Sequence, residues 1–302
     1  MNFDGSDLQC LTTGEEGYES PVFSPDGAQI TYVAYRLVPG EERVQNIYVM
    51  NADGTDQRAL TATDRDRCAV FSPNGQHIAF VSGRDGVMEI YRMRADGTEQ
   101  RRLTFVENRP EQQACPSPRN FAPVFSPDGQ RIVFTTTIVR PEQAGGVPPQ
   151  VRQLYHMRVD GHDITPFLSL KEECAFPMFS PRGDWLAFRN FNGFGDGLSH
   201  FCLIRPDGTD FQRLPYSHGI WASLHPESHY IVFTAFGDHN GPGPPRGKWA
   251  LACIRIEDGA QQRLADKSAN DKCPVFSPDG KQIVFCSDRN GSYEIYTIPY
   301  ET

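Results

Sequence analysis

The chain has 302 residues, with 29 basic and 38 acidic side chains, so its formal net charge is −9. A balance this acidic argues against a nucleic-acid-binding protein, which usually carries a basic face. No apolar run is long enough for a helix that inserts into a membrane. Residues 1–5 contain no basic segment followed by an apolar one, so no secretory signal is predicted. The protein is therefore expected to be cytoplasmic as it stands, or periplasmic if a signal sequence has been removed.

Copies of one short motif follow one another along the chain. The motif Phe-Ser-Pro-Asp/Asn-Gly and its degraded forms begin at Phe23, Phe71, Phe125, Phe179, Leu224 and Phe276, at intervals of 48, 54, 54, 45 and 52 residues. An aliphatic residue recurs seven positions after each start, and an aromatic residue recurs nine positions after it. Proline fixes φ and Asp-Gly tolerates positive φ, so each copy predicts a tight turn between two strands.

Each repeat continues with a third apolar run, an Asp-Gly turn and a short closing segment, as in residues 90–104. Four strands, here called a to d, in units of this length are typical of propeller blades. The last repeat lacks strand d, and residues 1–12 resemble the strand d segment at residues 50–61. The sequence therefore predicts an all-β fold in one domain, a monomeric six-bladed β-propeller whose ring is closed by the N-terminal strand. The blades are expected at about residues 20–61, 68–104, 121–168, 175–214, 220–264 and 273–298 plus 1–12.

The repeat at residues 71–104, with Ser-Gly-Arg-Asp-Gly at 82–86 and Glu-Ile-Tyr at 89–91, resembles the TolB-type propeller repeat family. The resemblance covers essentially the whole chain. Related repeats occur in translocation-complex proteins, in prolyl-oligopeptidase-like peptidases and in oligogalacturonate lyases. No Gly-x-Ser-x-Gly nucleophile motif accompanies the repeats here, so a hydrolase domain is not expected. The leading hypothesis is a binding module that captures a peptide, a protein loop or a small acidic ligand; a propeller fragment of a larger chain is another.

The candidate binding residues lie just before each strand a, on the face that carries the variable b–c and d–a connections. Binding residues commonly sit on loops held by a rigid scaffold, and a propeller offers few other concave sites. Cationic and aromatic side chains together suit a peptide, a sugar acid or another small anion; alternatively, the aromatic residues simply pack between blades. The predicted residues of the channel mouth are Glu19, Arg67, Cys68, Phe121, Phe176, His218, Trp221 and Lys272.

The competing hypothesis is an enzyme that uses the same mouth. His218 and His239 lie in variable loops of the fifth repeat, and His200 precedes them in the fourth. Resemblance to oligogalacturonate lyases implies a divalent metal, Mn, Fe or Zn, that would acidify the α-proton of a bound carboxylate, with Arg67 or Lys272 as anion partner or base. The alternative is that these histidines are solvated loop residues, and no cofactor is favoured.

The eight cysteines include no Cys-x-x-Cys pair, so a closed zinc site is poorly supported. Four of the cysteines precede a strand a: Cys68, Cys115, Cys174 and Cys273. Three interpretations are open: free thiols, a disulfide such as Cys115–Cys174, or metal ligands. So few cysteines for this length fit a reducing compartment better than an oxidising one.

The recurring Ser-x-Arg-x-Gly segments at the b–c turns contain Arg84 and Arg289. We expect these arginines to link neighbouring blades through ion pairs. Glu89 and Glu294, just before strand c, are their predicted partners.

Overall fold

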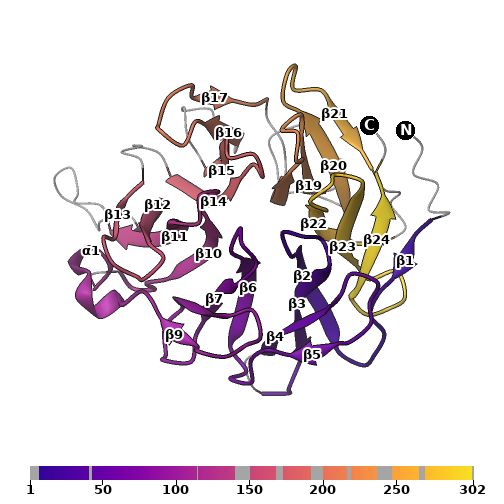
Figure 1. Cartoon of the computed structure of the whole chain (residues 1–302), viewed down its shortest axis with the longest axis horizontal. Coiled ribbons are helices and arrows are strands. Elements are labelled where there is room, and N and C mark those ends of the chain that lie inside the picture. Colours follow the sequence, from indigo (N-terminus) through magenta and orange to yellow (C-terminus); the bar gives the residue numbers. More distant parts are fainter. Residues whose placement is uncertain are drawn as a thin grey trace.

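The computed structural model describes residues 7–40, 43–113, 115–139, 150–167, 173–191, 200–215, 219–236, 247–264 and 269–300. Within these ranges, six four-stranded antiparallel sheets are arranged in a ring, which confirms the predicted six-bladed β-propeller (Figure 1). The first three blades are β2 (Gly17–Phe23), β3 (Gln29–Arg36), β4 (Val44–Asn51) and β5 (Arg58–Ala59); β6 (Asp66–Phe71), β7 (His77–Ser82), β8 (Glu89–Arg94) and β9 (Arg101–Arg102); and β10 (Asn120–Phe125), β11 (Arg131–Val139), β12 (Gln150–Arg158) and β13 (Thr165–Pro166).

The other three blades repeat the same strand order. They are β14 (Glu173–Phe179), β15 (Leu186–Phe191), β16 (His200–Ile204) and β17 (Gln212–Arg213); β18 (Gly219–Leu224), β19 (Tyr230–Phe236), β20 (Trp249–Arg255) and β21 (Gln261–Arg263); and β22 (Asp271–Phe276), β23 (Gln282–Ser287), β24 (Glu294–Pro299) and β1 (Gln9–Cys10). The first strand of each blade contacts the first strands of both neighbouring blades, so strands a surround the axis. Two short helices, η1 (Val106–Asn108) and α1 (Pro110–Gln113), lie between blades two and three. Neither could cross a membrane, and the described ranges contain no helix that could.

The N-terminal strand closes the ring, as the sequence predicts. β1 pairs antiparallel with β24 and places Cys10 opposite Tyr296 (Figure 1). The Thr12 hydroxyl donates a hydrogen bond of 2.6 Å to the buried Glu294 carboxylate and accepts one of 2.9 Å from the Ile295 N–H. Residues 9–12 are thereby joined to the last blade by both backbone and side-chain contacts.

The core lies within and between the blades. It includes the two recurring positions that lie seven and nine residues after the start of each motif. Both sets are almost fully shielded from solvent, with exposures of 1% or less. They are Ile30, Ile78, Ile132, Leu186, Ile231 and Ile283, and Tyr32, Phe80, Phe134, Phe188, Phe233 and Phe285. Burying one such side chain contributes about 1.5–3 kcal/mol, so the repeated pair is the main reason the blades stack.

The motif turns join strands a and b through side-chain hydrogen bonds. In blade one the Ser24 hydroxyl donates to Asp26 Oδ1 at 2.6 Å and accepts from the Gln29 N–H at 2.9 Å. Gly27 has a φ of 73°, and a Cβ there would meet Pro278 of the last blade at 3.6 Å. These short turns therefore interlock on one face and leave the opposite face to the longer b–c and d–a connections.

The predicted blade-to-blade role of Arg84 and Arg289 is wrong. Arg84 Nη2 lies 3.1 Å from Asp66 Oδ1 of its own blade, and Arg289 Nη2 lies 3.0 Å from Asp271 Oδ1 of its own blade. Strands a and b are antiparallel, so the end of strand b lies beside the start of strand a. An arginine at the b–c turn therefore contacts the first strand of its own blade. There it also donates from Nε to the serine that ends strand b, Ser82 in blade two, at 2.8 Å.

Blade five departs from the repeat at its first turn, where His225 replaces the motif serine. The ring is 4% exposed and packs edge-on against Phe276, with centroids 4.9 Å apart, and against Tyr300 at 5.8 Å. Its Nδ1 accepts a hydrogen bond of 3.2 Å from the Glu227 N–H. Desolvation by burial lowers the pKa of His225 below its usual 6.5, so the imidazole is held neutral.

Acidification below about pH 6.5 is expected to destabilise the fold through His225. The unfolded chain binds a proton there more readily than the folded chain, so stability is lost as pH falls, by at most about 1.4 kcal/mol per pH unit. The variant His225→Ser carries the serine that stands at this position in the other blades. Measured by urea denaturation between pH 7.5 and 5.5, its free energy of unfolding should fall less steeply with pH than that of wild type. His77 and His156, whose pKa values are also lowered by burial, contribute equally to both proteins. Equal slopes would show that His225 is not the responsible group.

Candidate functional site

A bulge in every innermost strand shapes the central channel. Just before each motif, one residue has a left-handed backbone: Ser20, Cys68, Ala122, Phe176, Trp221 and Cys273, with φ between 47° and 58°. The register of strand a against strand b shifts at the same place in all six blades. Such conformations are costly for residues other than glycine and persist only where the surroundings impose them. Here the preceding blade helps: the Phe176 N–H donates to Thr135 Oγ1 at 3.0 Å and the Cys273 N–H to Thr234 Oγ1 at 2.9 Å.

The bulges surround a mostly apolar cavity of about 190 Å³, to which all six blades contribute. Four of the predicted mouth residues line it: Cys68, Phe121, Phe176 and Trp221. The Phe121 and Phe176 rings meet edge to face at 5.6 Å, and Trp221 packs against Trp249 at 5.4 Å. These aromatic residues therefore both line the channel and pack on their neighbours.

Charged residues directly precede the channel residues Ser20 and Cys273. The Lys272 ammonium lies 3.4 Å from the Glu19 carboxylate and 3.6 Å from the centre of the Tyr293 ring. Glu19 Oε2 also forms an ion pair with Arg43 Nη2 at 2.9 Å, and the Arg43 guanidinium stacks on the Tyr35 ring. The predicted mouth residues Glu19 and Lys272 thus lie together, and Lys272 and Arg43 share the single carboxylate of Glu19.

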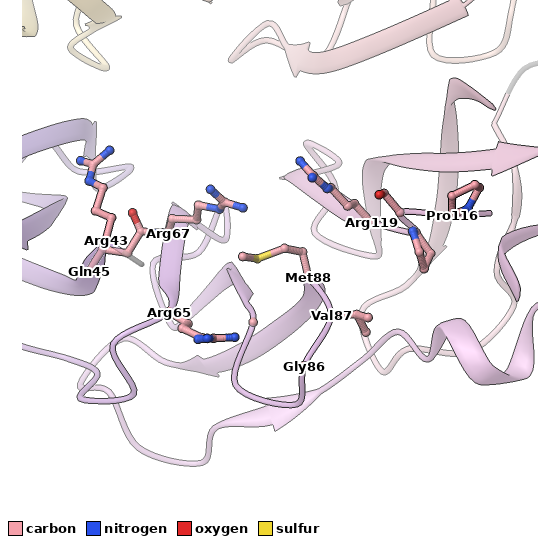
Figure 2. A pocket seen from close by; sticks show the side chains of 12 residues that line it. Arg43, Gln45, Arg65, Arg67, Gly86, Val87, Met88, Pro116 and Arg119 are labelled. Atoms are coloured by element: carbon pink, nitrogen blue, oxygen red, sulfur yellow. The ribbon is translucent and has the colours of Figure 1, made fainter. Parts of the chain in front are cut away.

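A second cavity, of about 480 Å³, opens beside the channel on the variable-loop face and is lined by four arginines, Arg43, Arg65, Arg67 and Arg119. They come from three blades: Arg43 precedes β4, Arg65 and Arg67 flank the start of β6, and Arg119 directly precedes β10. In Figure 2 the guanidinium groups of Arg67 and Arg119 extend toward each other above Met88. We call this cavity the arginine pocket.

Only Arg67 of this pocket was predicted from sequence. A recognisable signal marks two of the others, because Arg65 and Arg119 both stand six positions before their motifs, at Phe71 and Phe125. That position is two residues before the one used to choose Arg67. Side chains two residues apart in a strand share a face, so the earlier position was a candidate as well.

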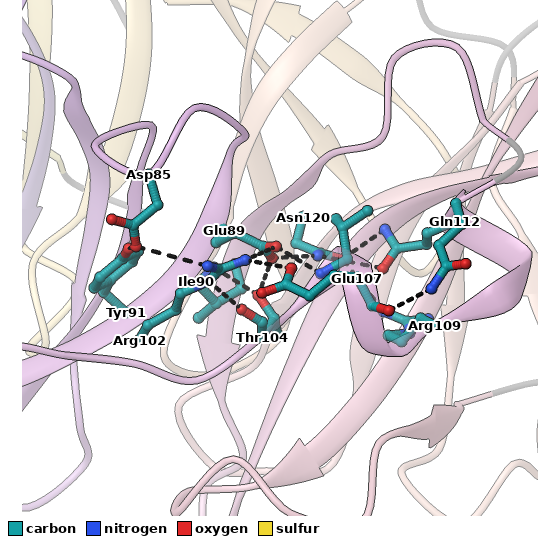
Figure 3. Close-up of polar contacts among 12 residues, drawn as sticks. Asp85, Glu89, Ile90, Tyr91, Arg102, Thr104, Glu107, Arg109, Gln112 and Asn120 are labelled. Carbon is teal, nitrogen blue, oxygen red and sulfur yellow. Dashed lines mark hydrogen bonds and ion pairs between the residues drawn. The ribbon is translucent and has the colours of Figure 1, made fainter.

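A buried carboxylate holds the connection that carries Arg119 (Figure 3). Glu89, which is fully buried, accepts hydrogen bonds from Arg102 Nη2 at 2.7 Å, Thr104 Oγ1 at 2.5 Å, the Val106 N–H at 2.8 Å and Asn120 Nδ2 at 2.7 Å. Paired charges with all their hydrogen bonds satisfied are the form in which a buried carboxylate is tolerated. Glu89 and Glu294 are therefore partners of the closing strand rather than of Arg84 and Arg289.

The same network continues into the short helix. Gln112 of α1 donates to Asn120 Oδ1 at 3.2 Å and to Thr136 Oγ1 at 2.6 Å, and the Asn120 N–H donates to the Met88 carbonyl at 2.8 Å. Since Arg119 directly precedes Asn120, these bonds set the point from which its side chain enters the arginine pocket.

The histidines of the metal hypothesis are not brought together within the described residues. His218 and His239 lie outside those ranges, so a metal site that uses them stays a prediction. His200 is buried in β16, with Nδ1 3.2 Å from the Leu214 carbonyl in the outer half of blade four. Across the ranges that are described, no group of three His, Cys, Asp or Glu side chains could hold a metal ion.

The cysteines are all free thiols, so the Cys115–Cys174 disulfide alternative is wrong. Cys68 lines the channel, and burial raises its pKa to about 11. Its thiol therefore stays protonated at neutral pH, where only the thiolate would be a good nucleophile or metal ligand.

No family model matches the sequence. The chain is 26% identical over 174 residues to the uncharacterized peptidase YuxL of Bacillus subtilis and 25% identical over 162 residues to a TolB homolog of Chlorobium chlorochromatii. These matches cover 56% and 53% of this chain but only 22% and 33% of those proteins, so the chain corresponds to a minor part of their length.

Solved structures match along nearly the whole chain. A putative TolB from Agrobacterium tumefaciens superposes with a TM-score of 0.64 at 20% identity, covering 97% of this chain and 94% of the other. An oligogalacturonate lyase from Vibrio parahaemolyticus superposes with a TM-score of 0.61 at 13% identity, covering 98% and 94%. At such identities the likeness concerns the fold alone, which hosts unrelated functions. The chain is thus a TolB-like six-bladed β-propeller.

Proposed function

We propose that this propeller is a binding module that captures a peptide, a protein loop or a small acidic ligand at the mouth of its central channel. The observation that carries the proposal is the aromatic channel, where Phe176 and Trp221 stand on strained bulges, and where Lys272, which contacts Glu19, directly precedes the channel residue Cys273. Aromatic side chains in a concave apolar site supply large contact area at low entropic cost.

The scaffold supports this assignment in a second way. The mouth is built on the innermost strands, which contact one another around the axis, so it is preorganised before any ligand arrives. Preorganisation lowers the entropy lost on binding, which is how a small contact area gives useful affinity.

Replacement of Trp221 by alanine is expected to weaken ligand binding about thirtyfold, because a buried aromatic anchor is typically worth about 2 kcal/mol or more. The probe is a set of 12-residue peptides selected on the wild-type protein from a random display library. Calorimetry of the selected peptides then compares wild type, Trp221→Ala and Phe176→Ala.

Phe211→Ala is the matched control, since Phe211 is 43% exposed and lies beyond the Asp207 turn, on the short-turn face. Its affinity for the peptides should equal that of wild type. If no peptide is selected, capture of a peptide is ruled out. If selected peptides bind all four proteins alike, the channel mouth is not their binding site.

A further inference from the structure

We infer that the arginine pocket is a second binding site, specific for a short ligand that carries at least two carboxylate groups. The pocket is distinct from the channel: it is lined by residues of blades one, two and three, and its Arg67 directly precedes Cys68, which lines the channel. The inference rests on the proposed function, because the arginine pocket would bind the acidic part of a ligand that is captured on the same face.

Among the residues that the structure describes, carboxylates balance only part of the charge of the pocket. Arg43 is paired with Glu19, but within the ranges that the structure describes neither Arg67 nor Arg119 has a carboxylate within ion-pair distance. Several arginines elsewhere are paired with carboxylates, such as Arg84 with Asp66 and Arg102 with Glu89.

This imbalance stands out in a chain with 38 acidic side chains and a net charge of −9. Two guanidinium groups that face each other repel, and holding their long side chains in place costs entropy. Because stability alone does not favour such an arrangement, a bound anion is the natural partner.

The shape and lining favour carboxylates on a short apolar frame. A guanidinium matches a carboxylate with two parallel hydrogen bonds, and facing guanidiniums can clamp two such groups. Val87, Met88, Pro116 and Pro118 supply apolar surface to the pocket, and Met88 lies between Arg67 and Arg119, where a hydrocarbon spacer would lie (Figure 2). A cavity of about 480 Å³ is in the range for small ligands.

A long polyanion such as nucleic acid fits less well. Nucleic-acid binding requires a basic stripe that follows several phosphates, whereas this basic patch is confined to one pocket of an acidic protein. The ligand is therefore either a small free acid or a few acidic side chains of a peptide, and both present the same chemistry.

The test is calorimetric titration of three probes at low ionic strength. Tricarballylate represents a free small acid, a capped Asp-Glu-Asp peptide represents acidic side chains, and pyrophosphate tests phosphate. Wild type should bind one of the two carboxylate probes with Kd below about 1 mM, and the tighter of the two identifies the source. Tighter binding of pyrophosphate than of both would overturn the carboxylate assignment.

Variants identify the pocket. Arg67→Ala and Arg119→Ala should each weaken binding roughly tenfold or more, the scale of a charge-assisted hydrogen bond. Arg94→Ala removes the same charge from an exposed side chain paired with Glu99 beside the β8–β9 turn, and should leave affinity unchanged. Absence of saturable binding, or equal affinity in all three variants, would overturn the proposal.

Thermal melting separates lost binding from lost folding. Without ligand, Arg67→Ala should melt no lower than wild type because it relieves a repulsion, and the carboxylate probe should raise the melting temperatures of wild type and Arg94→Ala more than that of Arg67→Ala. The two proposals also fail separately. If the binding of selected peptides depends on Trp221 but not on Arg67, the arginine pocket is rejected as a site and the channel is kept. If binding depends on Arg67 but not on Trp221, the channel is rejected.

Discussion

Replacing Leu11 by alanine is expected to lower the free energy of unfolding by about 2–5 kcal/mol, the usual cost of emptying a buried leucine site. Leu11 is 6% exposed and belongs to the apolar cluster that contains Tyr32 of blade one and Ile295 of blade six. Its N–H donates a 2.7 Å hydrogen bond to the Ile295 carbonyl. The side chain therefore fills the seam where the two ends of the chain meet, so the cavity should loosen the whole ring.

Thr13→Ala is the matched control, because Thr13 is exposed and lies two residues further along the same segment. Urea denaturation of both variants and wild type gives the comparison, and the m-value shows whether unfolding is still one transition. If Leu11→Ala were as stable as Thr13→Ala, the N-terminal segment would not hold the ring closed.

The fold could be predicted from sequence because its determinants are local and repeated. The turn at Ser24–Gly27 needs only proline, an Asx side chain and glycine, and the same letters recur in most blades. The buried pair at Ile30 and Tyr32 recurs with fixed spacing for the same reason. Even the closure by β1 is visible as a displaced copy of a strand d segment.

The candidate site was predictable only in part, because it depends on how non-repeated connections are placed. Phe176 and Trp221 lie at fixed positions before their motifs and were found. Arg119 shares with Arg65 its position before the motif, but it enters the pocket because a connection with two short helices, held by Glu89, returns beside blade two, and this connection has no counterpart in the repeat. The predicted partners of the charged residues were wrong for a similar reason. Glu89 was assigned to Arg84 because the two are close in sequence, whereas Arg102 and Thr104 contact it from the neighbouring strand segment.

The substitution Glu89→Gln is expected to cost about 3–5 kcal/mol of stability and also to weaken carboxylate binding in the arginine pocket. An amide cannot accept from Arg102, Thr104, the Val106 N–H and Asn120 together, and breaking a buried charged pair is strongly destabilising. The freed connection would no longer hold Arg119 opposite Arg67. Glu89 touches no ligand, so it is a positioning residue.

Glu294→Gln distinguishes positioning from general destabilisation. Glu294 occupies the same slot in blade six, is also buried and also accepts from a closing-strand threonine, Thr12, at 2.6 Å, but no residue near it lines the arginine pocket. Both variants should lose stability in urea denaturation, whereas only Glu89→Gln should lose affinity for tricarballylate under conditions where both are folded. Equal losses of affinity would mean that the effect is global. Unchanged affinity in both would mean that Arg119 is held in place without Glu89.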